Sequence, residues 1–307
     1  MSGTRHLGLD LGGTNIKAVV LEETGDGMPT VIEATTDPTV ADEGPAAVTS
    51  RMIDIGRREA ARHGPLTSVG IGVPGLFDAE AGRIELFPNL TGPWTGHSLR
   101  DPIAEALAVP AAMINDARAF TLAEATVGAG RGARTIACLT LGTGVGGGVF
   151  IDGAIRLGTF GTAGELGHQI VEPDGPLCGC GNRGCIEALT RSDVLIAAAG
   201  RGTVEDVYRN AAAGDERCID AITTAARYIG IGLANVLVVI GPERIVIGGG
   251  IAQAGEQALA PIRKAMWDHV TLVPRDSVPV VAAELGSSAG AIGAALAGRL
   301  TTHRATR

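Results

Sequence analysis

The sequence is poor in lysine and carries no excess of positive charge. Lys17 and Lys264 are the only lysines among 25 basic residues, and 33 acidic residues leave a net charge of −8. A protein that binds nucleic acid non-specifically needs a basic surface, so the composition argues against that class. We expect no nucleic-acid partner. We attribute the shortage of lysine primarily to codon usage. Of the two lysines, only Lys17 has a position that suggests a function.

The sequence also lacks a secretory leader and a long apolar run. Residues 1–6 are polar and lead directly into a strand pattern. The most apolar stretch, 229–241, is shorter than the roughly 20 residues that cross a bilayer, and it continues a helical pattern from Cys218. We expect a buried core helix there, no membrane association, and a cytoplasmic protein.

The length and the apolar content predict two folded domains. A chain of 307 residues has room for two domains of roughly 150 residues each. Hydrophobic residues make up 45% of the chain, which excludes wholesale disorder. The 46 glycines are about twice the usual share of ~7%, and they cluster in short segments.

A strand–turn–strand pattern occurs twice and indicates an internal duplication. Strands over 6–11 and 16–21 flank a Gly12–Asn15 turn, and strands over 135–141 and 145–151 flank a Gly142–Gly144 turn. We expect one such unit in each domain, with a boundary near residue 116. Further strands and helices alternate, which predicts an α/β fold with mixed sheets: strands over 30–35, 68–73, 111–114, 244–247 and 278–282, and helices over 44–63, 117–127 and 288–300.

Both turns have the composition of a phosphate site. Glycines let backbone N–H groups approach phosphate oxygens, and a threonine hydroxyl adds another donor. One Gly-rich hairpin alone is common, but two in equivalent positions could grip a polyphosphate from two sides. Neither turn has the P-loop or the dinucleotide-binding pattern. The candidate residues are Gly12, Gly13, Thr14, Asn15, Gly142, Thr143 and Gly144.

A cysteine cluster predicts a structural metal. The spacing His168-x9-Cys178-x-Cys180-x4-Cys185 offers three thiolates and one imidazole, the donor set of a closed tetrahedral Zn²⁺ site. Three ordinary thiols in a loop are the alternative, but interleaved glycines permit a tight knuckle. Cys138 and Cys218 lie in apolar segments and are expected to be buried packing residues.

Asp116 follows a strand and precedes a helix. The residue can be a helix N-cap, a common role for aspartate, or a general base for an alcohol at the carboxyl end of a sheet. The two roles are compatible, and the spacing does not choose between them. Glu165 and Glu187 flank the cysteine loop, where other charges are few, so they are candidates for hydroxyl recognition.

Taken together, these segments resemble the ROK family (repressors, open reading frames, kinases) and, within it, the bacterial glucokinases. The resemblance runs from about His6 to Leu300 with every motif in order, and the cysteine-rich segment is the most specific of them. The segments are Asp10-Leu-Gly-Gly-Thr-Asn15, Gly72-Val-Pro-Gly75, Pro88-Asn-Leu90, Asn115-Asp116, Leu141-Gly-Thr-Gly-Val-Gly-Gly-Gly148, Gly164-Glu-Leu-Gly-His168, Cys178-Gly-Cys-Gly-Asn-Arg-Gly-Cys-Ile-Glu187 and Ile247-Gly-Gly-Gly250.

The resemblance implies a two-domain, actin-like (ribonuclease H-like) ATPase fold with the active site in the cleft between the domains. The N-terminal domain would comprise residues 1–116 and 289–307, with the last helix returning to it. Residues 117–288 would form the C-terminal domain, which carries the second phosphate turn, the zinc loop and the nucleotide side.

The resemblance also implies individual roles. Asp116 matches the base that takes the proton from the sugar's 6-hydroxyl. His168 would be both a zinc ligand and a sugar contact, Asp10 matches the group near Mg²⁺, and ATP would be the phosphoryl donor. The implied sugar contacts are Asn89, Asn115, Asp116, Glu165, His168 and Glu187, and the implied phosphate and nucleotide contacts are Gly12 to Lys17, Gly142 to Gly144, Gly249 and Gly250.

These implications favour an ATP-dependent glucose 6-kinase. A kinase for fructose, mannose, N-acetylglucosamine or N-acetylmannosamine is the first alternative, since pocket differences of ~1–3 kcal/mol decide between such sugars. Polyphosphate is a less favoured donor. A sugar-responsive repressor is disfavoured because only nine residues precede Asp10, and a non-catalytic sugar sensor because both turns and both aspartates are present. Family relatives are often dimers or tetramers, so a homo-oligomer is expected.

Overall fold

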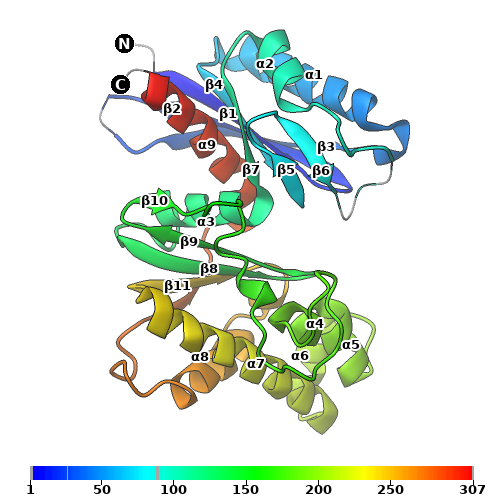
Figure 1. Cartoon of the computed structure of the whole chain (residues 1–307), viewed down its shortest axis with the longest axis vertical. Helices are drawn as coiled ribbons and strands as arrows, with labels where there is room; N and C mark the ends of the chain where they lie inside the picture. The colour runs from blue at the N-terminus through cyan, green and yellow to red at the C-terminus, as the bar shows by residue number, and fades with distance from the viewer. Residues whose placement is uncertain (1–2, 26, 88–89, 91, 306–307) are drawn as a thin grey trace. The chain divides into compact units, whose positions relative to one another are not determined.

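The computed structural model of the protein describes residues 3–25, 27–87, 90 and 92–305 (Figure 1). The chain divides into two compact units, which are described separately. Unit 1 comprises Met1–Ala123 and Ser287–Arg307, and unit 2 comprises Glu124–Gly286. The chain crosses between the units after residues 123 and 286, whereas the sequence placed the boundaries after residues 116 and 288.

Unit 1 is built on a five-stranded mixed sheet in the order β3-β2-β1-β4-β7. The first three strands along the chain pair antiparallel, and β1, β4 and β7 pair parallel. Tight hairpin closure at the β1/β2 turn follows from the glycines there, as the sequence predicted. The strands are β1 (Thr4–Leu11), β2 (Asn15–Glu23), β3 (Thr30–Pro38), β4 (Ser68–Val73) and β7 (Ala111–Asn115).

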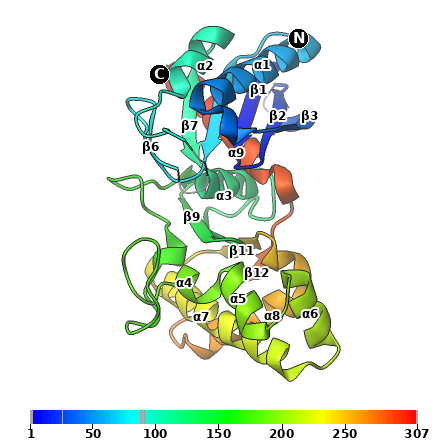
Figure 2. The same ribbon diagram turned by 90° about the vertical axis from the view of Figure 1, so that its right-hand side faces the viewer.

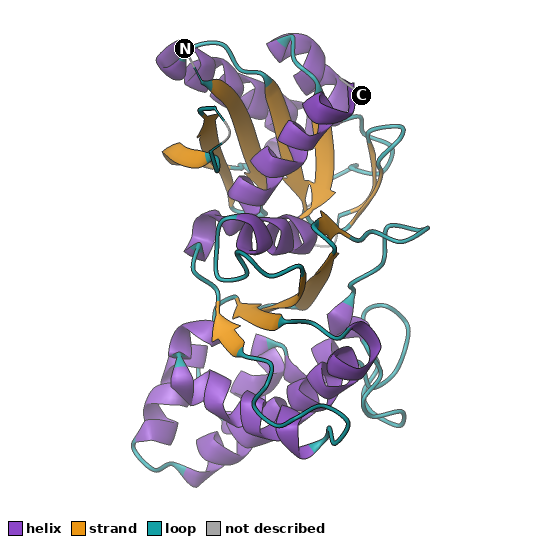
Figure 3. Cartoon of the chain, turned by 90° about the vertical axis from the view of Figure 1, so that its left-hand side faces the viewer, coloured by secondary structure: helices purple, strands orange, loops and turns teal. Residues whose placement is uncertain are grey.

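The two faces of this sheet differ in residue size. Alternate residues of β1, among them Leu7 and Leu9, are fully buried in one core with α1 (Pro45–His63) and α2 (Arg100–Leu107). Gly8 and Gly70 face α9 (Ala289–Ala305), and a Cβ on either would stand within 2 Å of a carbonyl oxygen of that helix. Glycine therefore allows the last helix to lie directly on the sheet (Figure 3).

Smaller elements complete unit 1. A two-stranded sheet pairs β5 (Leu76–Asp78) with β6 (Arg83–Leu86), and η1 (Ala41–Glu43) leads into α1. The helix α3 (Asp116–Thr126) follows β7 and carries the chain across the boundary into unit 2.

Unit 2 repeats the sheet topology of unit 1. Its order is β10-β9-β8-β11-β12, with antiparallel pairing from β10 to β8 and parallel pairing from β8 to β12. Two sheets that share this arrangement support the predicted internal duplication, and the chain has the two-domain α/β fold of the actin-like ATPases. The strands are β8 (Thr135–Leu141), β9 (Val145–Ile151), β10 (Ala154–Ile155), β11 (Arg244–Gly248) and β12 (Val280–Ala282).

The rest of unit 2 is mainly helical (Figure 2). A single core joins the sheet to the helices, and it includes Leu139, Ile247 and Leu233. The remaining elements are η2 (Leu166–His168), α4 (Ile186–Thr190), α5 (Ser192–Ala199), α6 (Val204–Ala212), α7 (Glu216–Ile240), η3 (Ile251–Ala254), α8 (Glu256–Asp268) and η4 (Gly286–Ser288), the last of which spans the boundary.

Helix α7 contains the apolar stretch that the sequence assigned to the core. It starts at Glu216 and has 25 residues, so by length and composition it is the one helix of the described residues that could cross a membrane. Half of its most apolar window is buried, and Ile229 and Leu233 are almost fully enclosed. The expected core helix is confirmed.

Candidate functional site

In unit 1, the first Gly/Thr turn is held by a residue that the sequence did not single out. The backbone N–H of Gly12 donates to the carbonyl of Asn15 at 3.0 Å, which closes the hairpin. Thr39 then binds the turn twice: its hydroxyl donates to the Gly12 carbonyl at 2.7 Å, and its N–H donates to the Thr14 carbonyl at 2.8 Å. Gly13, Thr14 and Asn15 at the tip are exposed, where they can meet a ligand.

Asp10 lies at the carboxyl end of β1, beside this turn. Burial, together with the charge of Asp116, raises its pKa to about 6, while Lys17 acts in the opposite direction. A Cβ on Gly290 would stand 2.4 Å from an Asp10 carboxylate oxygen, so glycine at that position leaves room for the carboxylate. Lys17 donates from Nζ to the Ser287 carbonyl at 2.8 Å.

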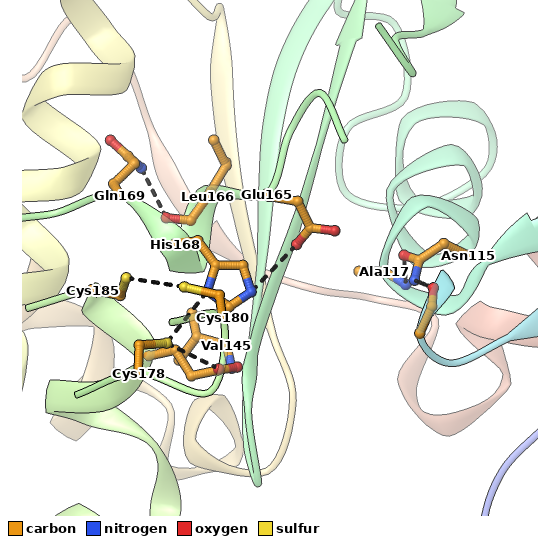
Figure 4. A network of polar contacts seen from close by, with 12 residues as sticks. Asn115, Ala117, Val145, Glu165, Leu166, His168, Gln169, Cys178, Cys180 and Cys185 are labelled. Carbon is orange, nitrogen blue, oxygen red and sulfur yellow. Dashed lines mark hydrogen bonds and ion pairs between the residues drawn. The ribbon is translucent and has the colours of Figure 1, made fainter. Parts of the chain in front are cut away.

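Asn115 and Asp116 stand where β7 passes into α3. The Asn115 side-chain oxygen accepts from the N–H groups of Ala117 at 3.1 Å and Arg118 at 3.3 Å, so Asn115 has the capping contacts considered for Asp116 (Figure 4). Asn115 also donates to the Gly75 carbonyl at 3.3 Å. Asp116 begins the helix, is exposed, and accepts from the Ala117 N–H at 2.8 Å.

In unit 2, the second Gly/Thr turn is supported by a carboxylate from the cysteine loop. The Gly142 N–H closes the hairpin on the Gly144 carbonyl at 3.0 Å. Glu187 on α4 accepts from the Val145 N–H at 2.9 Å, and its Oε2 would stand 2.7 Å from a Cβ on Gly144. Glycine at position 144 therefore lets Glu187 reach the turn. Thr143 at the tip is exposed.

The predicted metal donors of unit 2 come together. The ligand atoms of His168, Cys178, Cys180 and Cys185 all lie within 4.8 Å of one another. Cys180 and Cys185 have their sulfurs 3.7 Å apart, and Cys178 Sγ lies 3.6 Å from His168 Nδ1 (Figure 4). Zn–S bonds of about 2.3 Å and Zn–N bonds of about 2.0–2.1 Å give a tetrahedron with edges of this length, so the donor set fits zinc.

The three thiols have different pKa values because their surroundings differ. A hydrogen bond from the backbone of Asn182 lowers the pKa of Cys180, whereas burial raises the pKa of Cys178 and brings that of Cys185 to about 12. Three thiolates this close would repel one another without a cation. A metal that takes all three as thiolates accounts for their placement. Cys138 and Cys218 are buried, as expected.

Glu165 and His168 are positioned by glycines that pack against β9. A Cβ on Gly167 would stand 1.8 Å from the Val145 carbonyl oxygen, and Gly164 has a positive φ of 84°, where a Cβ would stand 2.9 Å from Gly148 Cα. The segment therefore lies directly on the strand. His168 Nε2 then points toward Glu165 Oε2 at 3.9 Å, on the opposite side of the ring from the cysteines (Figure 4).

A pocket in unit 2 adjoins the last glycine motif. Its volume is about 480 Å³. Gly250 forms part of its wall, and burial raises the pKa of the neighbouring Tyr208 to about 12. Gly249 has a φ of 88° and packs against Leu141, which places this motif beside the second turn. The other lining residues come from α6, η3 and α8: Val204, Glu205, Arg209, Ala212, Gln253, Ala254 and Gln257.

The structure thus groups most of the predicted site residues within their own units. Asn89, a predicted sugar contact, lies outside the described residues. Sequence reasoning missed Thr39 and the α6 side of the pocket. No local pattern marks either of them, because each is defined by a contact with a distant part of the chain.

Known proteins match this chain over nearly its whole length. The sequence profile of the ROK family matches residues 6–299. A glucokinase of Streptomyces coelicolor is 35% identical over 94% of this chain and 96% of its own length. A glucokinase of Halalkalibacterium halodurans is 32% identical over 95% of this chain and 94% of its own.

Solved structures are similar over the same extent. A ROK hexokinase from Thermus thermophilus has a TM-score of 0.85 at 34% identity and covers 98% of this chain and 100% of its own. A ROK family glucokinase from Streptomyces griseus, solved with glucose and AMPPNP, has a TM-score of 0.79 at 31% identity, covering 96% of this chain and 99% of its own.

Relatives with other functions also match. An N-acetylmannosamine kinase of Citrobacter koseri is 31% identical over 94% of this chain and 97% of its own. A xylose repressor of Bacillus subtilis is 30% identical over 74% of this chain but only 60% of its own length. Similarity alone therefore leaves the substrate open.

Proposed function

Because the chain belongs to the ROK family, and its full-length relatives include glucokinases, we propose that it phosphorylates glucose at the 6-hydroxyl with ATP as the donor. These relatives support a ROK sugar kinase that acts on a hexose. We propose glucose as the sugar, the 6-hydroxyl as the acceptor and the roles of single residues from the geometry that follows.

The observation that carries the proposal is the electrostatic coupling of Asp10 and Asp116. Both stand at carboxyl ends of parallel strands in unit 1, and the charge of Asp116 contributes to the raised pKa of Asp10. Two carboxylates that destabilise each other's charge in this way suit a site that receives a cation and a proton. We assign Asp10 to Mg²⁺ and Asp116 to the proton.

The chemistry asks mainly for position and charge neutralisation. The sugar's O6 attacks the γ-phosphorus of ATP as Asp116 accepts the hydroxyl proton. The bond from the γ-phosphorus to the β–γ bridging oxygen breaks, and ADP leaves with that oxygen. Mg²⁺, when bound through Asp10, supplies positive charge that neutralises the phosphates. The exposed carboxylate of Asp116 is accessible to an alcohol.

The donor contacts follow from the turns and the pocket. The N–H groups of Gly13 to Asn15 and of Thr143 and Gly144, with the hydroxyls of Thr14 and Thr143, are proposed to bind phosphate oxygens, while the N–H groups of Gly12 and Gly142 close the two hairpins. Lys17 would add a positive charge at the first turn. The 480 Å³ pocket is the proposed place of the adenosine, with Gly249 and Gly250 on its phosphate side. A base-sized pocket favours ATP over polyphosphate.

The sugar contacts are proposed from the polar side chains around both turns. Unit 1 contributes Asn115 and Asp116, and unit 2 contributes Glu165, His168 and Glu187. Zinc held by the four clustered donors would have no open coordination position, so it cannot activate the chemistry. Its proposed role is to fix the His168 ring with Nε2 directed away from the cysteines.

A coupled ADP-release assay tests the proposal. Purified protein receives Mg²⁺-ATP and, in turn, glucose, mannose, fructose, N-acetylglucosamine and N-acetylmannosamine, with polyphosphate as a parallel donor. We expect the highest kcat/KM for glucose with ATP. A preference for an N-acetylated sugar would contradict glucose as the substrate, but it would leave the assignments of the base and of the zinc unchanged. If folded and zinc-loaded protein turns over no pair of sugar and donor, the proposed kinase activity is wrong and a sugar sensor is favoured.

The cellular setting and assembly are part of the same proposal. We propose a cytoplasmic enzyme that acts as a homo-oligomer, a dimer or a tetramer. Size-exclusion chromatography with light scattering tests the assembly directly, and a monomer at assay concentrations would contradict it.

A further inference from the structure

A second group of metal-ligating side chains lies in unit 1, away from the residues discussed so far. Glu33 is on the edge strand β3, and Glu59 and His63 are four residues apart on α1. The carboxylate oxygens and the imidazole nitrogen all lie within 4.8 Å of one another. From this group we infer that the protein holds a further divalent cation, which fastens the end of α1 to β3.

Two of the facing atoms are buried and make no hydrogen bond. Glu59 is 1% exposed, and its Oε2 has no hydrogen-bond partner, while Oε1 accepts from Arg58 at 2.8 Å. His63 Nε2 is likewise buried without a hydrogen bond. Leaving buried polar atoms such as these without a partner destabilises the fold, so a ligand between them is expected.

The spacing of the atoms fits coordination better than a hydrogen bond. His63 Nε2 lies 3.4 Å from Glu33 Oε2 and 3.7 Å from Glu59 Oε2, and neither pair has hydrogen-bond geometry. Ligands at about 2.0–2.2 Å from a tetrahedral ion stand roughly 3.3–3.6 Å apart. Both distances from the ring nitrogen are therefore close to those between ligands of one ion, and the two oxygens lie within 4.8 Å of each other.

The surroundings favour a cation. His63 is the last residue of α1, where the helix dipole places partial negative charge. Two carboxylates near that end need a positive charge, and Arg58, whose guanidinium contacts Glu59, also binds Asp37. A divalent ion would neutralise the pair. Two carboxylate oxygens and one imidazole suit a borderline first-row ion such as Zn²⁺ or Co²⁺.

The cation would strengthen a contact that is otherwise polar. On the face of β3 that meets α1, Thr35 and Asp37 bind Arg58 at 2.7–3.2 Å. Because β3 is the edge strand of its sheet and exposes most of its side chains, little apolar packing holds it to the helix. A metal that joins Glu33 to Glu59 and His63 would fix the edge.

Metal titration of the full-length protein distinguishes this site from the cysteine cluster. After chelator treatment, Co²⁺ bound by thiolates gives an intense charge-transfer band, whereas Co²⁺ bound by oxygen and nitrogen gives only weak visible bands. Calorimetry with Zn²⁺ then counts the sites. We expect a Zn²⁺ equivalent that persists in Cys180→Ser and raises the Tm of that variant.

Three variants test the assignment in the Cys180→Ser background. Glu33→Gln, at a partly exposed edge position that tolerates change, and His63→Ala should each weaken this Zn²⁺ affinity at least about tenfold and abolish the Tm rise. Asp54→Asn, on the solvent side of α1 with a side chain 74% exposed, is the matched control and should leave both unchanged. Absence of Zn²⁺ binding in Cys180→Ser, or binding unaffected by Glu33→Gln and His63→Ala, would reduce the cluster to an ion pair and overturn the inference.

Discussion

Glu187 Oε2 accepts a hydrogen bond from the backbone N–H of Val145 at 2.9 Å, although 42 residues separate the two. The other carboxylate oxygen of Glu187 lies 3.8 Å from Cys178 Sγ. One side chain thus contacts both the cysteine cluster and the residue that follows the second Gly/Thr turn. We therefore expect that a change in the cysteine cluster shifts Glu187 and, with it, the position of the second Gly/Thr turn.

Cys180→Ser tests this connection together with the proposed zinc role. Loss of a thiolate should reduce bound zinc and release the His168 ring, so we expect the KM for the sugar to rise at least about tenfold. Metal analysis and steady-state kinetics on the same sample measure both effects. Cys218→Ser, at a cysteine outside the cluster, is the control. If zinc is lost while the sugar KM stays constant, the metal does not organise sugar binding.

Asp116→Asn tests the general base. The asparagine keeps the shape and the exposed position but accepts no proton, so kcat should fall by about 10²–10⁴ while the circular dichroism spectrum and Tm stay near wild type. Asp193→Asn is a matched control because Asp193 is also an exposed aspartate in the first turn of a helix. Turnover within a few-fold of wild type in Asp116→Asn would exclude the assignment.

Asp10→Asn should abolish activity and raise the free energy of unfolding. Folding raises the Asp10 pKa from 3.8 to about 6, so the folded state holds a proton that the unfolded chain has lost, and this carboxyl reduces stability as pH rises through that interval. At pH 8 the neutral asparagine should gain up to about 3 kcal/mol in unfolding free energy.

Denaturant unfolding of Asp10→Asn and wild type at pH 8 and at pH 5 measures this effect. The stability difference should be smaller at pH 5, where the wild-type carboxyl is largely protonated, and phosphoryl transfer should be lost in the variant at both. An equal difference at the two pH values would contradict the raised pKa of Asp10.

Ala212→Trp tests the nucleotide pocket. Ala212 is exposed and lines the pocket at the end of α6, so an indole there should fill part of the cavity without disturbing the core. We expect the KM for ATP to rise at least about tenfold with the sugar KM unchanged. Ala213→Trp is the neighbouring control, since Ala213 is exposed but does not line the pocket. Equal effects of the two substitutions would place the adenosine elsewhere.

Several features of this protein follow from the sequence because they depend on short segments. The hairpins at Gly12–Asn15 and Gly142–Gly144 follow from glycine permissiveness flanked by strand patterns. The four clustered donors lie within 18 residues of chain, so their spacing limits how far apart they can be. The core position of α7 follows from its apolar run.

The tertiary structure decided which distant groups meet. Thr39 holds the first turn, Glu187 supports the second, and α6 forms one wall of the pocket. The approach of Glu33 to His63 likewise depends on how β3 lies against α1. A residue's type and local period determine its backbone preference, whereas its neighbours across the fold depend on sheet order and helix packing, which short-range patterns do not encode.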